Sequence, residues 1–259
     1  MFCSAKMSMP LAAQPLRDDA MRWIAAVSTP LLRRMNLAAD RVEECERVLG
    51  NGGDNVVSEL LRSGPAFYEW DHYPQGDVFD AVSHSQYYYH AHPQEERPQE
   101  HGHFHLFLRP RGMPAQVLPA PVPDYAPCAV ADDALSHLVA IAMNRAGEPV
   151  KLFTTNRWVT AETWYVAPDV IAMLDRFRID HARPSWPVNL WISNLLILFR
   201  PQIEHLLLER DAVARAEGAS SPARDFYEDR EFEVLSQMDI SVERQIAAIR
   251  TEMRRRGLE

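Results

Sequence analysis

Five of the ten histidines in this chain fall within sixteen residues and alternate with other residues in two short segments. The first segment carries His90 and His92, and the second carries His101, His103 and His105. Successive side chains of a β-strand point to opposite faces, so each set shares one face of its strand. If the strands pair antiparallel and the numbers of each pair of facing residues add up to an odd number, both sets of histidines lie on the same face of the sheet. The sequence therefore predicts a sheet with one imidazole face.

The residues between these histidines are apolar and form the opposite face of the predicted hairpin. They are Tyr87, Tyr89, Ala91, Phe104, Leu106 and Leu108. This alternation is typical of a strand that packs one face against a core. The histidines therefore replace no core residue, and we expect them to form a separate surface that is open to water or lines a pocket.

Distances within a sheet limit how many of the five histidines bind one ion. Facing residues lie about 4.5–5.5 Å apart at Cβ, whereas His101 and His105 are roughly 13 Å apart in an extended strand. One ion would take His90, His92 and either His101 with His103 or His103 with His105. The remaining histidine would be a hydrogen-bond partner, a proton carrier or part of a second site.

Imidazole ligands also limit the choice of metal. They suit Fe(II), Cu, Zn, Mn or Ni, and they do not suit Ca or Mg. We expect one transition-metal ion, with Fe(II) or Cu preferred.

Other polar residues near the cluster are candidates for supporting roles. Tyr88 shares the face of His90, and Glu100 precedes His101, so either would supply an oxygen or orient an imidazole. Arg157 belongs to a polar and aromatic stretch, 154–164, that either closes a pocket or caps a helix. We predict Tyr88 and Arg157 as catalytic residues. The other five histidines are expected to be structural or exposed: His72, His84, His137, His181 and His205.

Helical, strand-like and again helical patterns follow one another in blocks, which predicts an α+β fold. We expect an antiparallel sheet built from two hairpins, flanked by N-terminal and C-terminal helices. The expected single domain, 1–259, has residues 1–16 without regular structure, 17–64 helical, 84–160 as the sheet with a Pro-rich loop at 109–127, and 168–256 helical.

Turn-forming residues set the expected boundaries within these blocks. Pro30 should bend or divide the first helix, Gly50 should end the second, and Asp54 should cap the third. Three further expectations are a loop over 65–85, a strand extension over 157–160 and a helix over 225–237.

Composition excludes several classes of protein. A net charge of −9 and the lack of mixed basic and aromatic clusters argue against nucleic-acid binding. The most apolar later stretch, 188–199, is too short to cross a membrane. Three cysteines without Cys-x-x-Cys spacing predict neither disulfides nor a thiolate zinc site, and residues 1–14 do not read as a signal peptide. We expect a cytoplasmic protein whose partner is a small-molecule substrate.

The histidine segments also resemble known sequence patterns. His90-x-His92 followed by Glu96 resembles part of the first cupin motif, in which histidines and a glutamate hold a metal inside a β-barrel. His84 stands where that motif has glycine, and Pro93 follows the second histidine. The segments Tyr-Tyr-Tyr-His-Ala-His and Glu-His-Gly-His-Phe-His are more similar to the signature of an uncharacterised bacterial domain family. The similarity extends through 154–164 and implies no particular activity.

Several functions fit these features. The leading hypothesis is a soluble enzyme with a His-ligated mononuclear metal, an oxidoreductase acting on a small organic substrate. The alternatives are a zinc hydrolase or lyase at the same site, a non-catalytic metal store, sensor or delivery protein, and a metal-free surface that responds to pH. An enzyme predicts a walled pocket, whereas a store predicts an exposed histidine face.

Overall fold

A six-stranded antiparallel sheet organises the computed structural model, which describes residues 20–62, 64, 67–93, 95, 97–122 and 134–258. The strands are β1 (Tyr73–Phe79), β2 (Ser85–His90), β3 (Gly102–Leu108), β4 (Ser136–Met143), β5 (Pro149–Thr155) and β6 (Val234–Asp239). Each strand pairs with the next along the chain, in the order β1-β2-β3-β4-β5-β6. The sheet is thus a meander with β1 and β6 at its edges.

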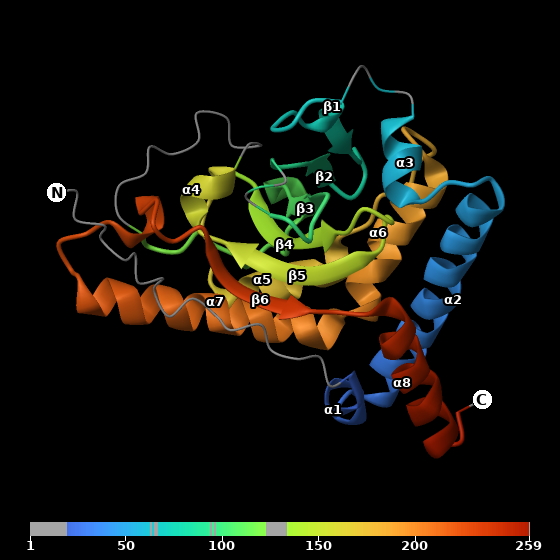
Figure 1. Ribbon diagram of the computed structural model, residues 1–259. Helices are drawn as coiled ribbons and strands as arrows, with labels where there is room; N and C mark the ends of the chain where they lie inside the picture. Colours follow the sequence, from blue (N-terminus) through green and yellow to red (C-terminus); the bar gives the residue numbers. More distant parts are fainter. Residues whose placement is uncertain are drawn as a thin grey trace, which may run out of the picture.

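Helices precede and follow this sheet, which confirms the predicted α+β class. They are α1 (Ala20–Ala25), α2 (Thr29–Asn51), α3 (Val56–Leu61), α4 (Arg157–Thr160), α5 (Ala167–Met173), α6 (Trp186–Leu198), α7 (Arg200–Ser220) and α8 (Val242–Arg255). Short 3-10 turns are η1 (Pro110–Gly112), η3 (Leu174–Arg176) and η4 (Phe226–Glu228). In Figure 1, α5, α6 and α7 lie behind the sheet, with α2 beside α6.

The face of the sheet that meets these helices holds the main core. Tyr87, Tyr89, Phe104 and Leu106 are fully buried there together with apolar residues of α2, α6 and α7. The hydroxyl of Tyr87 donates a 2.7 Å hydrogen bond to Oδ1 of Asn189 on α6. The apolar alternation of the sequence therefore predicted the packed face correctly.

The N-terminal helices differ in their boundaries from the prediction. The predicted first helix is divided just before Pro30, between α1 and α2, as expected; Pro30 itself lies in the first turn of α2, where its missing N–H removes no helical hydrogen bond, and Ser28 caps that helix. The helix then continues past Gly50, and the cap of α3 is Asn55 rather than Asp54. Residues 1–16, expected to lack regular structure, lie outside the described residues.

Two segments are strands that the sequence pattern did not predict. The first, β1, falls in the expected loop 65–85, because Pro74 and Gly76 argue against a central strand but are tolerated at a sheet edge. The second, β6, falls where a helix was expected over 225–237, and it pairs with β5 instead. The sheet therefore extends beyond 84–160 on both sides.

The segments that follow β5 and β3 were predicted to extend a strand and to form a Pro-rich loop. Residues 157–160 form α4 and do not extend β5, because the Asn156 side chain caps a helical turn by accepting a 2.8 Å hydrogen bond from the backbone N–H of Arg157. Of the Pro-rich loop 109–127, the described part holds η1 and a backbone hydrogen bond from Ala120 N to Trp164 O. Among the described residues, no helix is long and apolar enough to cross a membrane.

Candidate metal centre

The register of the sheet places the histidines of β2 and β3 opposite one another. His90 faces His103 and Tyr88 faces His105, so the facing numbers add up to an odd number, as the imidazole face requires. On β4 the neighbours of His103 and His105 are Ala142 and Ala140.

Two rows of side chains therefore cross the sheet face that points away from the core helices. The first row is His90, His103, Ala142, Lys151 and Asp239. The second row is Tyr88, His105, Ala140, Phe153 and Gln237. Because the two alanines are small, the rings of His103 and Phe153 have room to meet edge-on, with their centroids 5.2 Å apart.

Three of the predicted ligands come together on this face. His90, His92 and His103 each offer a ring nitrogen, and these atoms lie within 4.8 Å of one another. The Nε2 atoms of His90 and His103 are 2.7 Å apart, so they share one proton or one cation. The buried Nδ1 of His103 has no hydrogen-bond partner among the described residues, and such an atom calls for a ligand. This cluster of three histidines fits a metal ion.

Burial keeps the imidazoles of His90 and His103 neutral. It lowers the pKa of His90 from 6.5 to about 3, with further contributions from the charges of His92, His72 and Arg97. Burial also holds the pKa of His103 well below 6.5. Metal ions bind the neutral ring, so at neutral pH no proton competes with a cation here.

His105 lies beside this cluster in the second row, with its ring centroid 4.7 Å from that of His103. Its ring is buried, and its Nδ1 lies 3.0 Å from Nε2 of His137, whose Nδ1 is 3.2 Å from the hydroxyl of Thr155. Sequence reasoning treated His137 as an isolated histidine, because a bulge between Leu106 and Phe107 shifts the register that brings it to this face. His105 and His137 therefore support the cluster from within the sheet.

His101 does not lie on the imidazole face, contrary to the prediction. The strand begins only at Gly102, and the chain bends at His101, so the alternation does not extend to it. Its Nδ1 lies 2.6 Å from the hydroxyl of Tyr89, on the core side, and its ring stacks on Phe67. A Cβ at Gly102 would overlap the backbone carbonyl oxygen of His90 and lie 2.6 Å from the Tyr89 hydroxyl oxygen, so the close approach of β2 and β3 here requires glycine.

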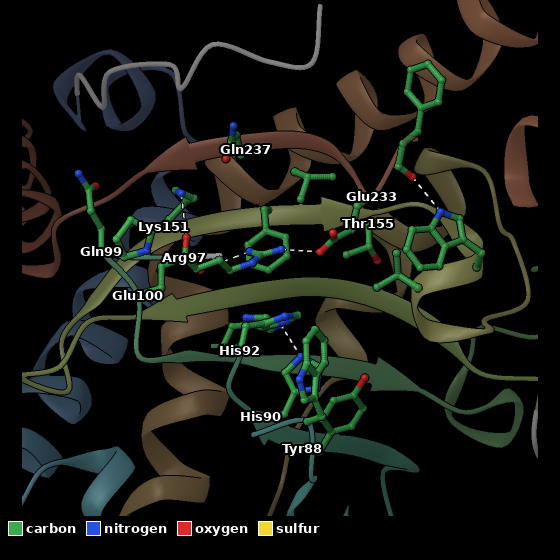
Figure 2. Close-up of a pocket in the computed structure, with 18 of the residues that line it drawn as sticks. Tyr88, His90, His92, Arg97, Gln99, Glu100, Lys151, Thr155, Glu233 and Gln237 are labelled. Atoms are coloured by element: carbon green, nitrogen blue, oxygen red, sulfur yellow. Dashed lines mark hydrogen bonds and ion pairs between the residues drawn. The ribbon is translucent and has the colours of Figure 1, made fainter. Parts of the chain in front are cut away.

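A pocket of about 900 Å³ opens over the cluster of three histidines. Its walls come from the segment before β1, the turn between β2 and β3, β5, α4 and the residues leading into β6 (Figure 2). Aromatic rings form much of the wall: Trp70, Tyr88, Phe153, Trp158 and Phe232. The histidine face is therefore walled rather than fully exposed.

Of the two predicted catalytic residues, one lines the pocket and the other does not. Tyr88 lines the pocket, and its ring stacks on His72 with centroids 3.6 Å apart. His72 itself hydrogen bonds to Asp77, so one of the histidines expected to be structural belongs to the pocket wall. Arg157 does not line the pocket, and its guanidinium pairs with Glu228.

Apart from Glu100, sequence reasoning missed the charged groups of the pocket. Arg97 and Lys151 both pair with Glu100, and Arg97 also pairs with Glu233. Strand alternation along β5 would have placed Lys151 on the histidine face. No local signal indicated Arg97 or Glu233, because they meet only when β6 joins the sheet. Glu100 is thus held by two cations, whereas Glu96, the glutamate in the resemblance to the cupin motif, lies outside the described residues.

The comparisons with known proteins bear on family and not on activity. Neither a curated protein nor a solved structure matches the chain. A family model described as a domain of unknown function, DUF6969, matches residues 36–240 and so spans the cluster of three histidines and all six strands. The chain therefore belongs to the DUF6969 family.

Proposed function

We propose that this protein is a metal-dependent enzyme in which His90, His92 and His103 bind one transition-metal ion at the wall of the pocket. The observation that carries the proposal is the convergence of three ring nitrogens within 4.8 Å, beside a pocket of about 900 Å³. Pockets of this size bind small organic molecules. The substrate is therefore a small molecule that binds next to the ion.

An enzyme fits this arrangement better than a metal store or delivery protein. Three protein ligands leave one position open on a tetrahedral ion and more on an octahedral ion. The open side faces a walled pocket that carries polar and charged groups, among them Tyr88, Arg97 and Lys151. A store requires no such groups around the ion.

The ligand set favours chemistry in which the ion keeps its full charge. Neutral imidazoles do not offset the charge of a divalent ion, so a bound ion polarises a substrate or a water strongly. We propose Fe(II) or Cu and an oxidoreductase reaction first, because such metals are common at imidazole sites with open positions. A zinc-activated water in a hydrolase or lyase is the alternative.

Metal analysis of protein purified without an affinity tag tests this proposal. The wild-type protein is expected to hold close to one metal ion per chain. His90→Ala and His103→Ala should lose most of it. His101→Ala is the matched control, because His101 comes from the same segment but its ring lies on the core side. Metal content that His103→Ala leaves unchanged would contradict the proposal.

The identity of the bound metal then separates the two reaction types. Iron or copper, together with metal-dependent consumption of dioxygen in the presence of substrate, supports the oxidoreductase. Zinc as the metal that restores full occupancy and activity supports the hydrolase or lyase instead.

A further inference from the structure

Charged side chains along the pocket form a chain of ion pairs. Lys151 Nζ lies 2.9 Å from one oxygen of Glu100, and Arg97 Nη1 lies 3.3 Å from the other. The second terminal nitrogen of Arg97 lies 2.5 Å from Glu233. Arg97 thus stands between two carboxylates, as Figure 2 shows.

The two carboxylates that flank Arg97 differ in how firmly they are held. The Glu100 side chain is 6% exposed and pairs with two cations. Its removal would leave Arg97 and Lys151 without the carboxylate that they share. The Glu233 side chain is 44% exposed and pairs with Arg97. An ion pair with a partner this exposed contributes little, so another carboxylate can replace Glu233 at small cost.

Arg97 also faces the same cavity as the cluster of three histidines. Its guanidinium lies over the ring of Phe153, 5.5 Å from the centroid, and that ring meets the ring of His103. Figure 2 shows His90 and His92 on one side of the Arg97 side chain.

We propose that the substrate of this enzyme is a small organic carboxylate, and that its carboxylate replaces Glu233 on Arg97 while the rest of the molecule extends toward the metal ion. The inference rests on the proposed function, because the ion provides the second point of attachment. Arg97 Nη2, which now pairs with Glu233, would donate to the substrate carboxylate while Nη1 stays paired with Glu100, and such a charge-assisted hydrogen bond is stronger than a neutral one.

The rest of the pocket agrees with this class of molecule. The rings of Trp70, Phe153 and Trp158 line it and suit a flat or apolar body. With a divalent ion bound, the ion, Arg97 and Lys151 exceed the lining carboxylates of Glu100, Glu231 and Glu233 by one unit of charge, which gives the pocket a positive potential. That potential attracts an anion and repels a cationic substrate.

Calorimetric titration of the zinc-loaded full-length protein tests the inference. The probes are benzoate, its uncharged analogue benzamide, and inorganic phosphate. Benzoate is expected to bind more tightly than the other two. Arg97→Gln should weaken benzoate binding by about tenfold or more, because a hydrogen-bonded charge is lost. Glu233→Gln should tighten it about two- to fivefold, because the competing carboxylate is gone.

A control variant and the zinc content of each variant distinguish failure of this inference from loss of the metal site. Arg111→Gln removes an exposed arginine outside the pocket and should leave benzoate binding unchanged. Zinc content, measured for each variant, should stay near one per chain. If Arg97→Gln keeps its zinc and binds benzoate as tightly as wild type, the inference is overturned and the metal site stands.

Other outcomes overturn the inference in different ways. Benzoate that binds no better than benzamide removes the argument for a carboxylate, and tighter binding of phosphate through Arg97 assigns another class of anion. Wild-type protein that takes up no zinc or other transition metal overturns the proposed function, and this inference with it.

Discussion

Acidification of the metal-free protein should destabilise it steeply, because the imidazole face is buried in its neutral form. Burial lowers the pKa of His90 and His137 to about 3 and holds the pKa of His103 and His105 well below the ordinary 6.5. In the unfolded chain these rings regain their ordinary pKa, so only the unfolded state takes up protons as the pH falls from 6.5. Each ring then costs about 1 kcal/mol of stability between pH 6.5 and 5.5.

The raised pKa of Glu162 has the opposite effect on stability from the lowered pKa values of the histidines. Burial raises its pKa from 4.5 to about 7, with Arg210 acting against the rise. The folded state therefore holds a proton that the unfolded state releases between about pH 4.5 and 7, so Glu162 adds stability as the pH falls through that window. The gain is about 1 kcal/mol between pH 6.5 and 5.5. With four histidines and one glutamate, the expected net loss is about 3 kcal/mol.

Urea unfolding at pH 6.5 and 5.5, in the presence of a chelator, measures this difference directly. His137→Gln removes one titrating ring, so its loss should shrink to about 2 kcal/mol, and Glu162→Gln should enlarge the loss to about 4 kcal/mol. Because each variant is compared with itself at two pH values, a general loss of stability does not affect the result. A wild-type loss below about 1 kcal/mol would refute the reasoning.

Three further substitutions test the packing that holds the site. Gly102→Ala should destabilise the protein by about 3 kcal/mol in urea unfolding, because the new methyl group would overlap the Tyr89 hydroxyl. Tyr87→Phe should cost about 1–3 kcal/mol by the same assay, because Oδ1 of the buried Asn189 loses its donor, and it should leave metal content unchanged. Ala142→Leu should lower metal occupancy and reduce the free energy of unfolding by about 1–3 kcal/mol, because the larger side chain fills the space beside His103. Full metal occupancy in this variant would show that the space is not needed.

The sequence predicted the central hairpin and its register because the information is local. Alternation along β2 and β3 separates His90 and His103 from Tyr89 and Phe104, and a shift by one residue would bury the wrong set. The same rule failed at His101, because alternation holds only within a strand and the chain bends before Gly102.

The edges of the sheet and the charged groups of the pocket depend on contacts that no local pattern contains. Before β6 is placed beside β5, nothing brings Glu233 near Arg97, which lies 136 residues earlier. The segment that contains β6 was assigned to a helix from its local composition, and tertiary pairing overrides such a preference. The three histidines of the candidate metal centre were therefore predictable, whereas Arg97 and Glu233, which are proposed to select a substrate, were not.

The hydrogen bonds of the buried histidines distinguish those that support the cluster from those that would bind an ion. His105 Nδ1 hydrogen bonds to His137, and His137 uses its other ring nitrogen to hydrogen bond to Thr155. His103 pairs with His90 through one nitrogen and leaves the other without a partner among the described residues. A cation at the cluster of three histidines would bind only the folded chain, so metal should stabilise the protein by about 3 kcal/mol at one hundred times its Kd. Binding of an ion at His90, His92 and His103 would thus couple the stability of this face to metal binding.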